Sequence, residues 1–344
     1  MDTPWRVAEC KLACALPWHF MHDAVTAAYE RIRPYVRETP VDESRSLADG
    51  GTATVFLKLE HLQHTGSFKF RGACNKIALL TGEQAAAGVV AASNGNHGLG
   101  VAAAARARGI AAEVFVSAQV SPAKATRIAA HGAVLRQAGN DPLTAELAAR
   151  QAAESSGRVF ISPYNDLDVV AGQGTIAVEL HGQIPDLEAV FVAVGGGGLI
   201  GGIGSYLKSV APHTEIVGCW PENSPVLHEC LRAGRVIDVP EQPTLSESTA
   251  GGLEPGSVTL AVCQKAIDSS VFVSETEIAA AMRLVLETEH WLIEGAAAVA
   301  VAAFRKDMRR WDGKRVAIVL CGRNVSPEVL ARVIEAGYTD FQSS

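Results

Sequence analysis

Short apolar runs alternate with alanine-rich stretches along most of this chain. Apolar strands covered by helices on both faces are typical of a mostly parallel sheet in an α/β protein, so the pattern predicts that fold class. One long irregular stretch, 238–257, interrupts the alternation, and its length favours a functional loop over a domain boundary. The predicted strands are 53–60, 88–93, 111–117, 133–139, 159–162, 189–196, 215–220 and 315–322, and the predicted helices are 21–32, 97–109, 122–132, 142–157, 168–182, 198–210 and 224–234, with two more starting near Lys69 and at Ser326.

Composition excludes several classes of protein. The chain has 344 residues, which favours two lobes over one small domain, and a net charge of −7 without a long basic run, which argues against a nucleic-acid partner. The apolar run at 296–304 is too short to span a membrane, and the first ten residues lack the cationic start of a secretory signal. Seven cysteines, an odd number spread over a long chain, favour the reducing cytoplasm, and the lone pair Cys10 and Cys14 does not form a metal motif.

Four chemically unusual stretches follow predicted strands. They are "TGSFKFRG" (65–72), "SNGNHG" (93–98), "VGGGGLIGG" (194–202) and "CGRNVS" (321–326). Ligands of parallel sheets bind where loops leave the carboxyl ends of strands. We therefore expect the four stretches to meet at one edge of the sheet and to form one site.

The four consecutive glycines, 195–198, predict an anion site. Without Cβ atoms, their backbone N–H groups can converge on a phosphate at the start of the following helix. A tight turn with close packing is the alternative, but packing alone seldom needs four glycines in succession. The loop lacks the Lys-Ser/Thr pair of a nucleotide P-loop.

The "SNGNHG" loop suits a carboxylate, because free N–H groups at a helix start favour negative charge. Simple capping would explain one of its polar residues but not four. His97 has no visible partner and is interpreted as a residue that positions the loop. Cys321 in the last loop is either a small buried hydrophobe or a thiol that hydrogen-bonds a neutral ring nitrogen, and the residues alone leave both open.

Lys69 lies between two phenylalanines at the start of a helix. A surface lysine is the ordinary interpretation, but a lysine desolvated by aromatic neighbours loses its proton more easily and can act as a covalent catalyst. An amine, a phosphate cradle and a carboxylate cradle together suggest pyridoxal phosphate acting on an amino acid.

These motifs resemble a known family. "KLEHLQHTGSFKFRGA" resembles the lysine motif of fold type II (tryptophan synthase β family) pyridoxal phosphate enzymes, in the serine/threonine dehydratase branch. "SNGNHG" is similar to that branch's carboxylate loop and "VGGGGLIGG" to its phosphate loop, while "AGQGTIAVEL" (171–180) and "CGRN" follow in the expected order. The likeness runs from Met21 to the last helix, without room for the regulatory domain of biosynthetic threonine dehydratases.

The resemblance implies two three-layer α/β/α domains with mostly parallel sheets. Residues 21–87 and 166–344 would form a large cofactor-binding domain, 88–165 a small mobile domain, and 1–20 an N-terminal extension. It also implies a cytoplasmic homodimer that acts on a small-molecule amino acid.

The resemblance further assigns roles to individual residues. Lys69 would form the Schiff base with the cofactor and then act as general base, and Phe68 would lie against the pyridine ring. Asn96 would bond the ring hydroxyl, Cys321 would face the ring nitrogen, and Glu294 would lie near the ring, although a Glu early in a helix also supports the helix electrostatically. The remaining cofactor-binding residues would be Gly195, Gly196, Gly197, Gly198, Leu199 and Gly252, with Gly251 beside them, and the substrate-binding residues would be Ser93, Asn94, Gly95, Asn96, His97 and Tyr164.

Three departures from the family pattern matter. Asn94 replaces a serine that serves serine racemase as acid/base, which disfavours racemisation. Trp220 and Val226 occupy the positions of the branch's metal ligands, so no metal site is expected. "SPYND" (162–166) places Tyr164 and Asn165 where they would shape the substrate pocket.

The sequence therefore predicts a pyridoxal phosphate-dependent dehydratase that removes water from a β-hydroxy amino acid. Serine, threonine, 3-hydroxyaspartate and phenylserine all stay open as substrates. An amino acid racemase or a β-replacement synthase of the same fold is the alternative. A nicotinamide dehydrogenase is disfavoured because the glycine loop lies far from the first βαβ unit, and a non-catalytic binding protein would have no need of Lys69 between two phenylalanines.

Overall fold

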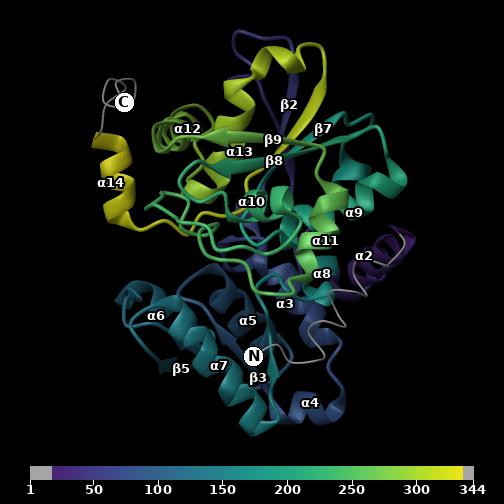
Figure 1. The fold of residues 1–344 in the computed structure, drawn as a ribbon. Coiled ribbons are helices and arrows are strands. Elements are labelled where there is room, and N and C mark those ends of the chain that lie inside the picture. Colours follow the sequence, from purple (N-terminus) through teal and green to yellow (C-terminus); the bar gives the residue numbers. More distant parts are fainter. Residues whose placement is uncertain (1–17, 336–344) are drawn as a thin grey trace.

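The computed structural model describes residues 18–335, which form two sheets stacked one above the other in Figure 1. The larger sheet has six strands in the order β1-β2-β10-β7-β8-β9, and the smaller has four in the order β5-β4-β3-β6. The strands are β1 (Val41–Ser44), β2 (Thr54–Lys58), β3 (Val89–Ala92), β4 (Ala112–Val116), β5 (Val134–Gln137), β6 (Val159–Phe160), β7 (Ala189–Ala193), β8 (Glu215–Pro221), β9 (Ser269–Val273) and β10 (Arg315–Val319).

All neighbouring strands are parallel except β1, which pairs with β2 in the antiparallel direction. In the centre of the larger sheet, Val316 of β10 lies opposite Val55 on one side and Ala189 on the other. Strand β7, "AVFVA", is buried along its whole length, as continuous apolar strands covered on both faces require.

Helices cover both sheets. They are α2 (Trp18–Ile32), α3 (Lys69–Ala78), α4 (Gly82–Ala87), α5 (Asn96–Ala107), α6 (Pro122–Ala130), α7 (Pro142–Ser156), α8 (Leu167–Gln183), α9 (Gly198–Val210), α10 (Val226–Ala233), α11 (Val258–Ala266), α12 (Glu275–Thr288), α13 (Gly295–Lys306) and α14 (Pro327–Glu335), with the short 3-10 turns η1 (Glu60–Leu62), η2 (His64–Gly66) and η3 (Met308–Trp311).

Helix α3 lies between the two sheets. One face of it packs on α5, which covers the smaller sheet, and another packs on α8, which also packs against α9 of the larger sheet. Phe70 and Ile77 of α3 belong to the hydrophobic core of the smaller sheet. The helix that begins with Lys69 is therefore held from both sides.

The alternating pattern in the sequence is confirmed as a parallel α/β fold. The expectation that all four loops leave one sheet edge is wrong, because "SNGNHG" follows β3 of the smaller sheet whereas the other three follow β2, β7 and β10 of the larger one. Predicted helix 21–32 begins three residues earlier, at Trp18. The segment 296–304 lies in α13 and is buried in the main core.

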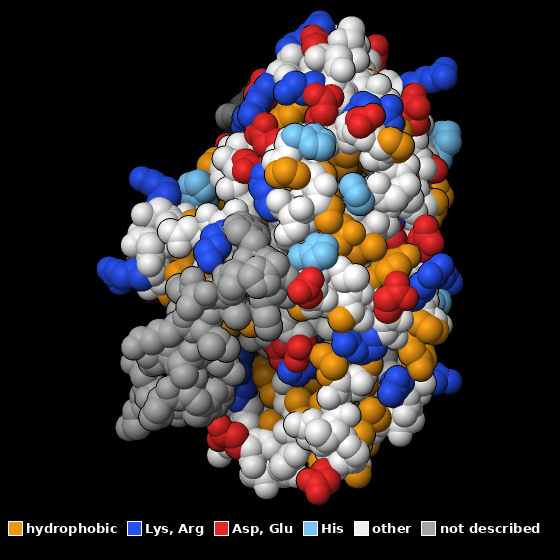
Figure 2. All heavy atoms as spheres, turned by 90° about the vertical axis from the view of Figure 1, so that its right-hand side faces the viewer, with side chains coloured by type: hydrophobic (Ala, Val, Ile, Leu, Met, Phe, Trp, Pro, Cys, Tyr) orange, Lys and Arg blue, Asp and Glu red, His pale blue; other side chains and the backbone are white. Residues whose placement is uncertain are grey.

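The visible surface in Figure 2 carries acidic and basic side chains interspersed, with hydrophobic side chains between them. Within residues 18–335, no helix is both long and apolar enough to cross a membrane. Five cysteines are described, all free and buried: Cys74, Cys219, Cys230, Cys263 and Cys321. The predicted N-terminal extension lies, except for its last residues, outside the described part, and so do Cys10 and Cys14.

Candidate active site

A pocket opens between the two sheets at the carboxyl ends of their strands. It encloses about 490 Å³ of empty space, counted with its opening to solvent. Its lining comprises Phe68, Lys69, Asn96, Tyr164, Ala193, the glycines 195–198, Leu199, Ile200, Ser248, Thr249, Glu294, Ala296 and Cys321.

Lys69 is the first residue of α3 and is only partly exposed. Its Nζ donates a hydrogen bond to the Pro163 carbonyl at 2.9 Å and lies 5.3 Å from the centre of the Phe68 ring. Burial lowers the pKa of Lys69 to about 8, partly opposed by Cys321 and by the Glu294 carboxylate. Lys69 is thus a desolvated amine that faces the pocket, as its aromatic neighbours suggested.

The backbone around Lys69 is fixed to the last strand of the sheet. The Phe68 N–H donates to the Cys321 carbonyl at 3.1 Å, and Ser67 forms an isolated β-bridge with Gly322. These bonds place Lys69 and Cys321, which are 252 positions apart in the chain, at the same end of the pocket.

The glycine loop leads from β7 into α9. Gly197 is the N-cap of α9 with a φ of 84°, and no side chain caps this helix start, so its first N–H groups are available to a ligand. Close packing also requires the glycines: a Cβ at Gly195 would lie 2.7 Å from the Thr249 carbonyl oxygen, and one at Gly196 would overlap the Tyr164 ring. The structure therefore agrees with both interpretations of the glycines, as an anion site and as a closely packed turn.

Asn96 lies at the centre of a polar cluster. Its Nδ2 donates to both carboxylate oxygens of Glu294, at 2.8 and 3.0 Å, and to Ser248 Oγ at 3.3 Å. Asn324 donates its backbone N–H to Glu294 at 2.8 Å and its Nδ2 to Asn96 Oδ1 at 2.5 Å. Glu294 is the N-cap of α13 but makes no capping bond, because its carboxylate is used by the two asparagines.

Ser248, Thr249 and Asn324 were not predicted from the sequence. Ser248 and Thr249 lie in the irregular stretch that was interpreted as a functional loop, which was the only signal for them. Asn324 is the last residue of the quoted motif "CGRN", which was expected at the site, but no role was assigned to it, and only its contacts reveal its place in the cluster.

The "SNGNHG" loop reaches the pocket through Asn96 alone. Asn94 is tied to the end of β4, because it donates to Ser117 Oγ at 2.7 Å and accepts from the Ser117 N–H at 2.9 Å. The Ser93 hydroxyl accepts from the Gly95 N–H at 3.0 Å. These three residues do not line the pocket.

His97 is buried, and its Nε2 lies 2.8 Å from the Ile161 carbonyl oxygen. Burial, together with the nearby Lys69 charge, lowers the pKa of His97 to about 3, so the imidazole is neutral and donates this bond. Its bond joins the loop to the end of the smaller sheet, and it does not line the pocket.

Cys321 lies two residues after the end of β10 and is buried against the pocket. Burial raises the pKa of the Cys321 thiol well above its usual value, and the Glu294 carboxylate raises it further. The thiol is therefore neutral, and it can act as a weak hydrogen-bond donor but not as a counter-ion.

Tyr164 covers the glycine loop. Its hydroxyl accepts from the Glu254 N–H at 3.1 Å and donates to the Gly252 carbonyl at 3.5 Å. Burial raises the pKa of Tyr164, so the phenol is neutral. Gly252 contacts the Tyr164 hydroxyl but does not itself line the pocket. Asn165 donates to the Glu254 carboxylate and accepts from the Val258 N–H, so it does not line the pocket either.

No group of three or more His, Cys, Asp or Glu side chains within residues 18–335 could hold a metal ion. Trp220 is fully buried, with its ring 5.4 Å from that of His228, and Val226 is buried at the start of α10. These are the two positions at which the sequence departs from the metal ligands of the branch.

Comparison with known proteins identifies the family. Residues 32–322 match the model of the pyridoxal-phosphate dependent enzymes. The chain belongs to this family. It is 41% identical over 91% of its length to an L-threonine ammonia-lyase of Thermotoga maritima, of which it covers 78%, and 35% identical over 88% of its length to a serine racemase of Arabidopsis thaliana, of which it covers 92%. The processed form of threonine deaminase isoform 2 from Solanum lycopersicum superposes with a TM-score of 0.87 at 29% identity, covering 95% of this chain and 94% of that one.

The pocket fits the cofactor of this family, pyridoxal phosphate. A lysine amine that is easily deprotonated lines it, and so does a helix start whose N–H groups have no side-chain cap and can bind a phosphate. The resemblance inferred from the motifs and the predicted α/β fold are both confirmed.

Proposed function

We propose that this protein is a dehydratase that eliminates water from a β-hydroxy amino acid, after which the released enamine hydrolyses to a 2-oxo acid and ammonia. The observation that carries the proposal is the Lys69 amine, which faces the pocket with a pKa of about 8. The names of several relatives, L-threonine ammonia-lyase among them, support this reaction type.

Several residues would hold the cofactor. The N–H groups of Gly195 to Leu199 would bind its phosphate, Lys69 its aldehyde and Asn96 its ring hydroxyl, with Phe68 beside the ring. When bound, the cofactor supplies an electron sink for the bonds at Cα of an amino acid.

Lys69 would hold the proton that leaves Cα. At neutral pH a pKa near 8 leaves about a tenth of the amine unprotonated, whereas an exposed lysine is almost fully protonated. This amine can therefore accept a proton at Nζ and release it again within one turnover. Its neighbour Cys321 has no charge to hold a proton on the ring nitrogen, which favours loss of the β-hydroxyl over reactions that need a long-lived carbanion.

The substrate carboxylate would bind at the loop from Ser93 to His97. Asn94 holds the loop to β4, and the neutral His97 holds it to the end of β6, so its N–H groups are preorganised for an anion. Tyr164 and Gly252 would border the substrate side of the cofactor.

Racemisation is the second candidate, favoured by the likeness to serine racemases. Asn94 argues against it, because an amide is too weak an acid and too weak a base to transfer a proton on the opposite face of Cα, and both ends of this amide are already bonded to Ser117. Chiral analysis of residual substrate distinguishes the two reactions.

We further propose that residues 88–165 move as a unit against 21–87 and 166–344, that two copies form a homodimer, and that the protein acts in the cytoplasm. The smaller sheet and its helices supply 89–160, which supports the division of the chain. The hydrophobic side chains exposed on the face of Figure 2 are compatible with a second copy.

The experiment is to add serine, threonine, 3-hydroxyaspartate and phenylserine to the purified holoenzyme and to assay 2-oxo acid and ammonia. Release of both in equal amounts from at least one of them is expected. The proposal fails if the enzyme, with cofactor bound, releases neither and instead inverts Cα, or captures an added thiol.

A further inference from the structure

The segment "AGQGTIAVEL" has no part in the chemistry described above, yet it occupies a central place. It forms the middle of α8, which packs against α3 on one side and α9 on the other. Helix α3 begins with Lys69, and α9 begins at the glycine loop. The same helix therefore touches the element that carries Lys69 and the element that carries the glycine loop.

On the α3 side the backbones are in close contact. A Cβ at Gly172 would lie 2.7 Å from Gly72 Cα and 2.8 Å from the Arg71 carbonyl oxygen. Gln173 Oε1 accepts from the Gly72 N–H at 3.1 Å, so this contact also has a fixed register. Any larger residue at Gly172 would push α3 away from α8.

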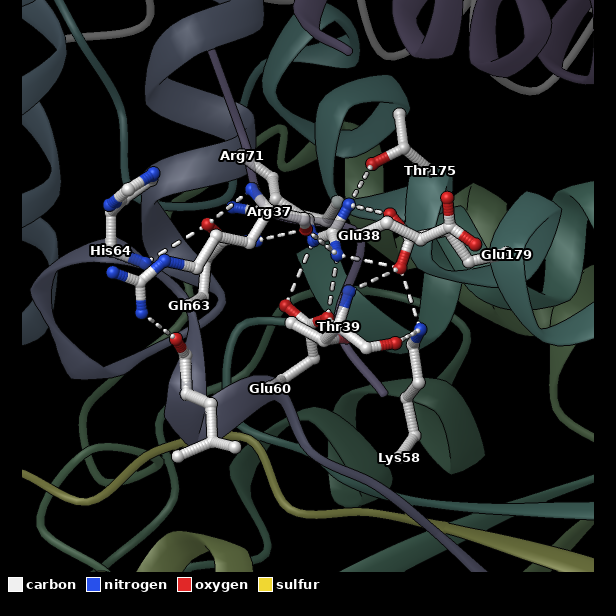
Figure 3. Close-up of polar contacts among 12 residues, drawn as sticks. Arg37, Glu38, Thr39, Lys58, Glu60, Gln63, His64, Arg71, Thr175 and Glu179 are labelled. Atoms are coloured by element: carbon white, nitrogen blue, oxygen red, sulfur yellow. Dashed lines mark hydrogen bonds and ion pairs between the residues drawn. The ribbon is translucent and has the colours of Figure 1, made fainter. Parts of the chain in front are cut away.

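A buried group of four charges completes this contact (Figure 3). Arg71, two positions after Lys69, bonds Glu60 through Nε at 2.9 Å and Nη2 at 2.7 Å. It also bonds Glu179 of α8 through Nη1 at 2.6 Å and Nη2 at 2.9 Å. Lys58 of β2 donates to the same Glu179 at 2.6 Å. The network thus joins the strand, the turn after it, α3 and α8.

The charges of the network balance, and its members find hydrogen-bond partners within the protein. Two cations face two anions, and all four side chains are almost fully buried. Burial disfavours the charge on Glu60, but the Arg71 guanidinium outweighs it and holds the pKa of Glu60 below its usual value. Lys58 donates its other two protons to the Thr39 carbonyl at 2.7 Å and Gln183 at 2.8 Å.

Such a network is poorly explained as a stabiliser. A buried ion pair is often no more stable than apolar side chains of the same volume, because desolvation offsets the attraction, whereas loss of one partner costs several kcal/mol. Its strict geometry instead permits one arrangement of α3 on α8. Arg71 lies in the same helical turn as Lys69, so this arrangement also fixes the position of the Lys69 backbone, from which the side chain extends.

On the α9 side the contact is again between glycines. A Cβ at Gly174 would lie 2.8 Å from the Gly202 carbonyl oxygen, and one at Gly202 would overlap the Val170 carbonyl. Gly202 lies four residues after Gly198, where α9 begins. The two glycine contacts of α8, at Gly172 and Gly174, thus fix the separation between α3 and α9.

We propose that residues 172–179 of α8 are a spacer that sets the distance between the Lys69 amine and the phosphate-binding glycine loop, with Arg71 and Glu179 as positioning residues for Lys69. This inference rests on the proposed function, in which one ligand is bonded at both ends. A rigid ligand anchored by its phosphate reaches the amine only when that separation is correct.

Two ligands separate the contributions of the two ends. Pyridoxine 5′-phosphate has the ring and phosphate but an alcohol in place of the aldehyde, so it reports on the glycine loop alone. Pyridoxal 5′-phosphate also needs Lys69. The measurements are the Kd of the alcohol on cofactor-free protein and the rate at which the aldehyde becomes reducible onto Lys69 by borohydride, read by mass spectrometry.

The variants are Gly172→Ala and Glu179→Gln, with Gly182→Ala as the matched control, because Gly182 lies in the same helix and a Cβ there meets nothing within 4 Å. In the first two variants we expect the Kd of the alcohol to change by less than about threefold, while linkage of the aldehyde slows by about tenfold or more. The control should match the wild type in both measurements.

An unchanged linkage rate in the variants overturns the spacer, and so does an equal loss of both ligands, which would indicate general destabilisation. If Gly172→Ala fails to fold, Glu179→Gln and Arg71→Lys decide the question. Wild-type protein that never links the aldehyde at Lys69 would overturn the proposed function itself, whereas normal linkage in wild type and variants alike overturns only the spacer.

Discussion

The buried amine of Lys69 should destabilise the protein when no cofactor is bound. A lysine whose pKa falls from 10.5 to about 8 on folding costs up to about 3 kcal/mol at pH 7, because the folded state holds a charge it disfavours. The cost is fully present below pH 8 and disappears as the pH rises through the unfolded value near 10.5. The substitution Lys69→Met should remove this free-energy cost, because methionine is of similar length and carries no charge.

The expected gain in the free energy of unfolding is largest at pH 7 and about 2 kcal/mol smaller at pH 9.5, where Lys69 of the folded protein has already lost its proton and no longer holds a disfavoured charge. The lost bond to the Pro163 carbonyl lowers the gain by about 1 kcal/mol at both pH values. The assay is urea unfolding of cofactor-free wild type and variant, followed by tryptophan fluorescence.

Lys58→Met is the control for this prediction. Burial also lowers the pKa of Lys58, but its ammonium bonds Glu179 and two other acceptors, so its removal should destabilise the protein at both pH values by about 3 kcal/mol or more. A Lys69→Met variant that gains nothing at pH 7, or gains equally at pH 7 and 9.5, would refute the argument that Lys69 is desolvated.

Three further results are expected. Treatment with a chelator followed by gel filtration should leave the activity and Tm unchanged, since the resemblance implies that Trp220 and Val226 replace the metal ligands of the branch; a loss restored by a divalent ion would contradict this. Tyr164→Phe should raise the KM for the substrate about threefold to tenfold, because the Glu254 N–H loses the hydroxyl that accepts its bond. An unchanged KM would show that the hydroxyl is dispensable. In an NMR titration the His97 ring should stay neutral down to about pH 4, given its pKa of about 3, and protonation near pH 6 would disprove its burial against Ile161.

Local pattern was enough to predict most of the secondary structure. The helix after the glycine loop was predicted to the residue, whereas the strand before it starts as predicted but ends at Ala193, three residues before its predicted end, because the glycines leave the sheet. The short edge strand β1, "VDES", was missed since its two central residues are polar and exposed, and β9 was missed because only its last residue is fully buried.

The assembly of the site could be predicted only in part. Which sheet a strand joins depends on distant partners, so the motif after β3 was assigned to the wrong edge. Asn324 was missed for the same reason, because its partner Asn96 is 228 positions away in the chain. Lys69 was identified because its signal, two flanking aromatic residues in a specific motif, is local.

Every proposed step of the reaction depends on the bond between Lys69 and the cofactor. Purified protein loaded with pyridoxal phosphate should be reduced with borohydride, digested, and its labelled peptide identified by mass spectrometry. We expect one label, on Lys69, and loss of the visible absorbance on reduction. A label on another lysine, or none in protein that binds the cofactor, would contradict the account.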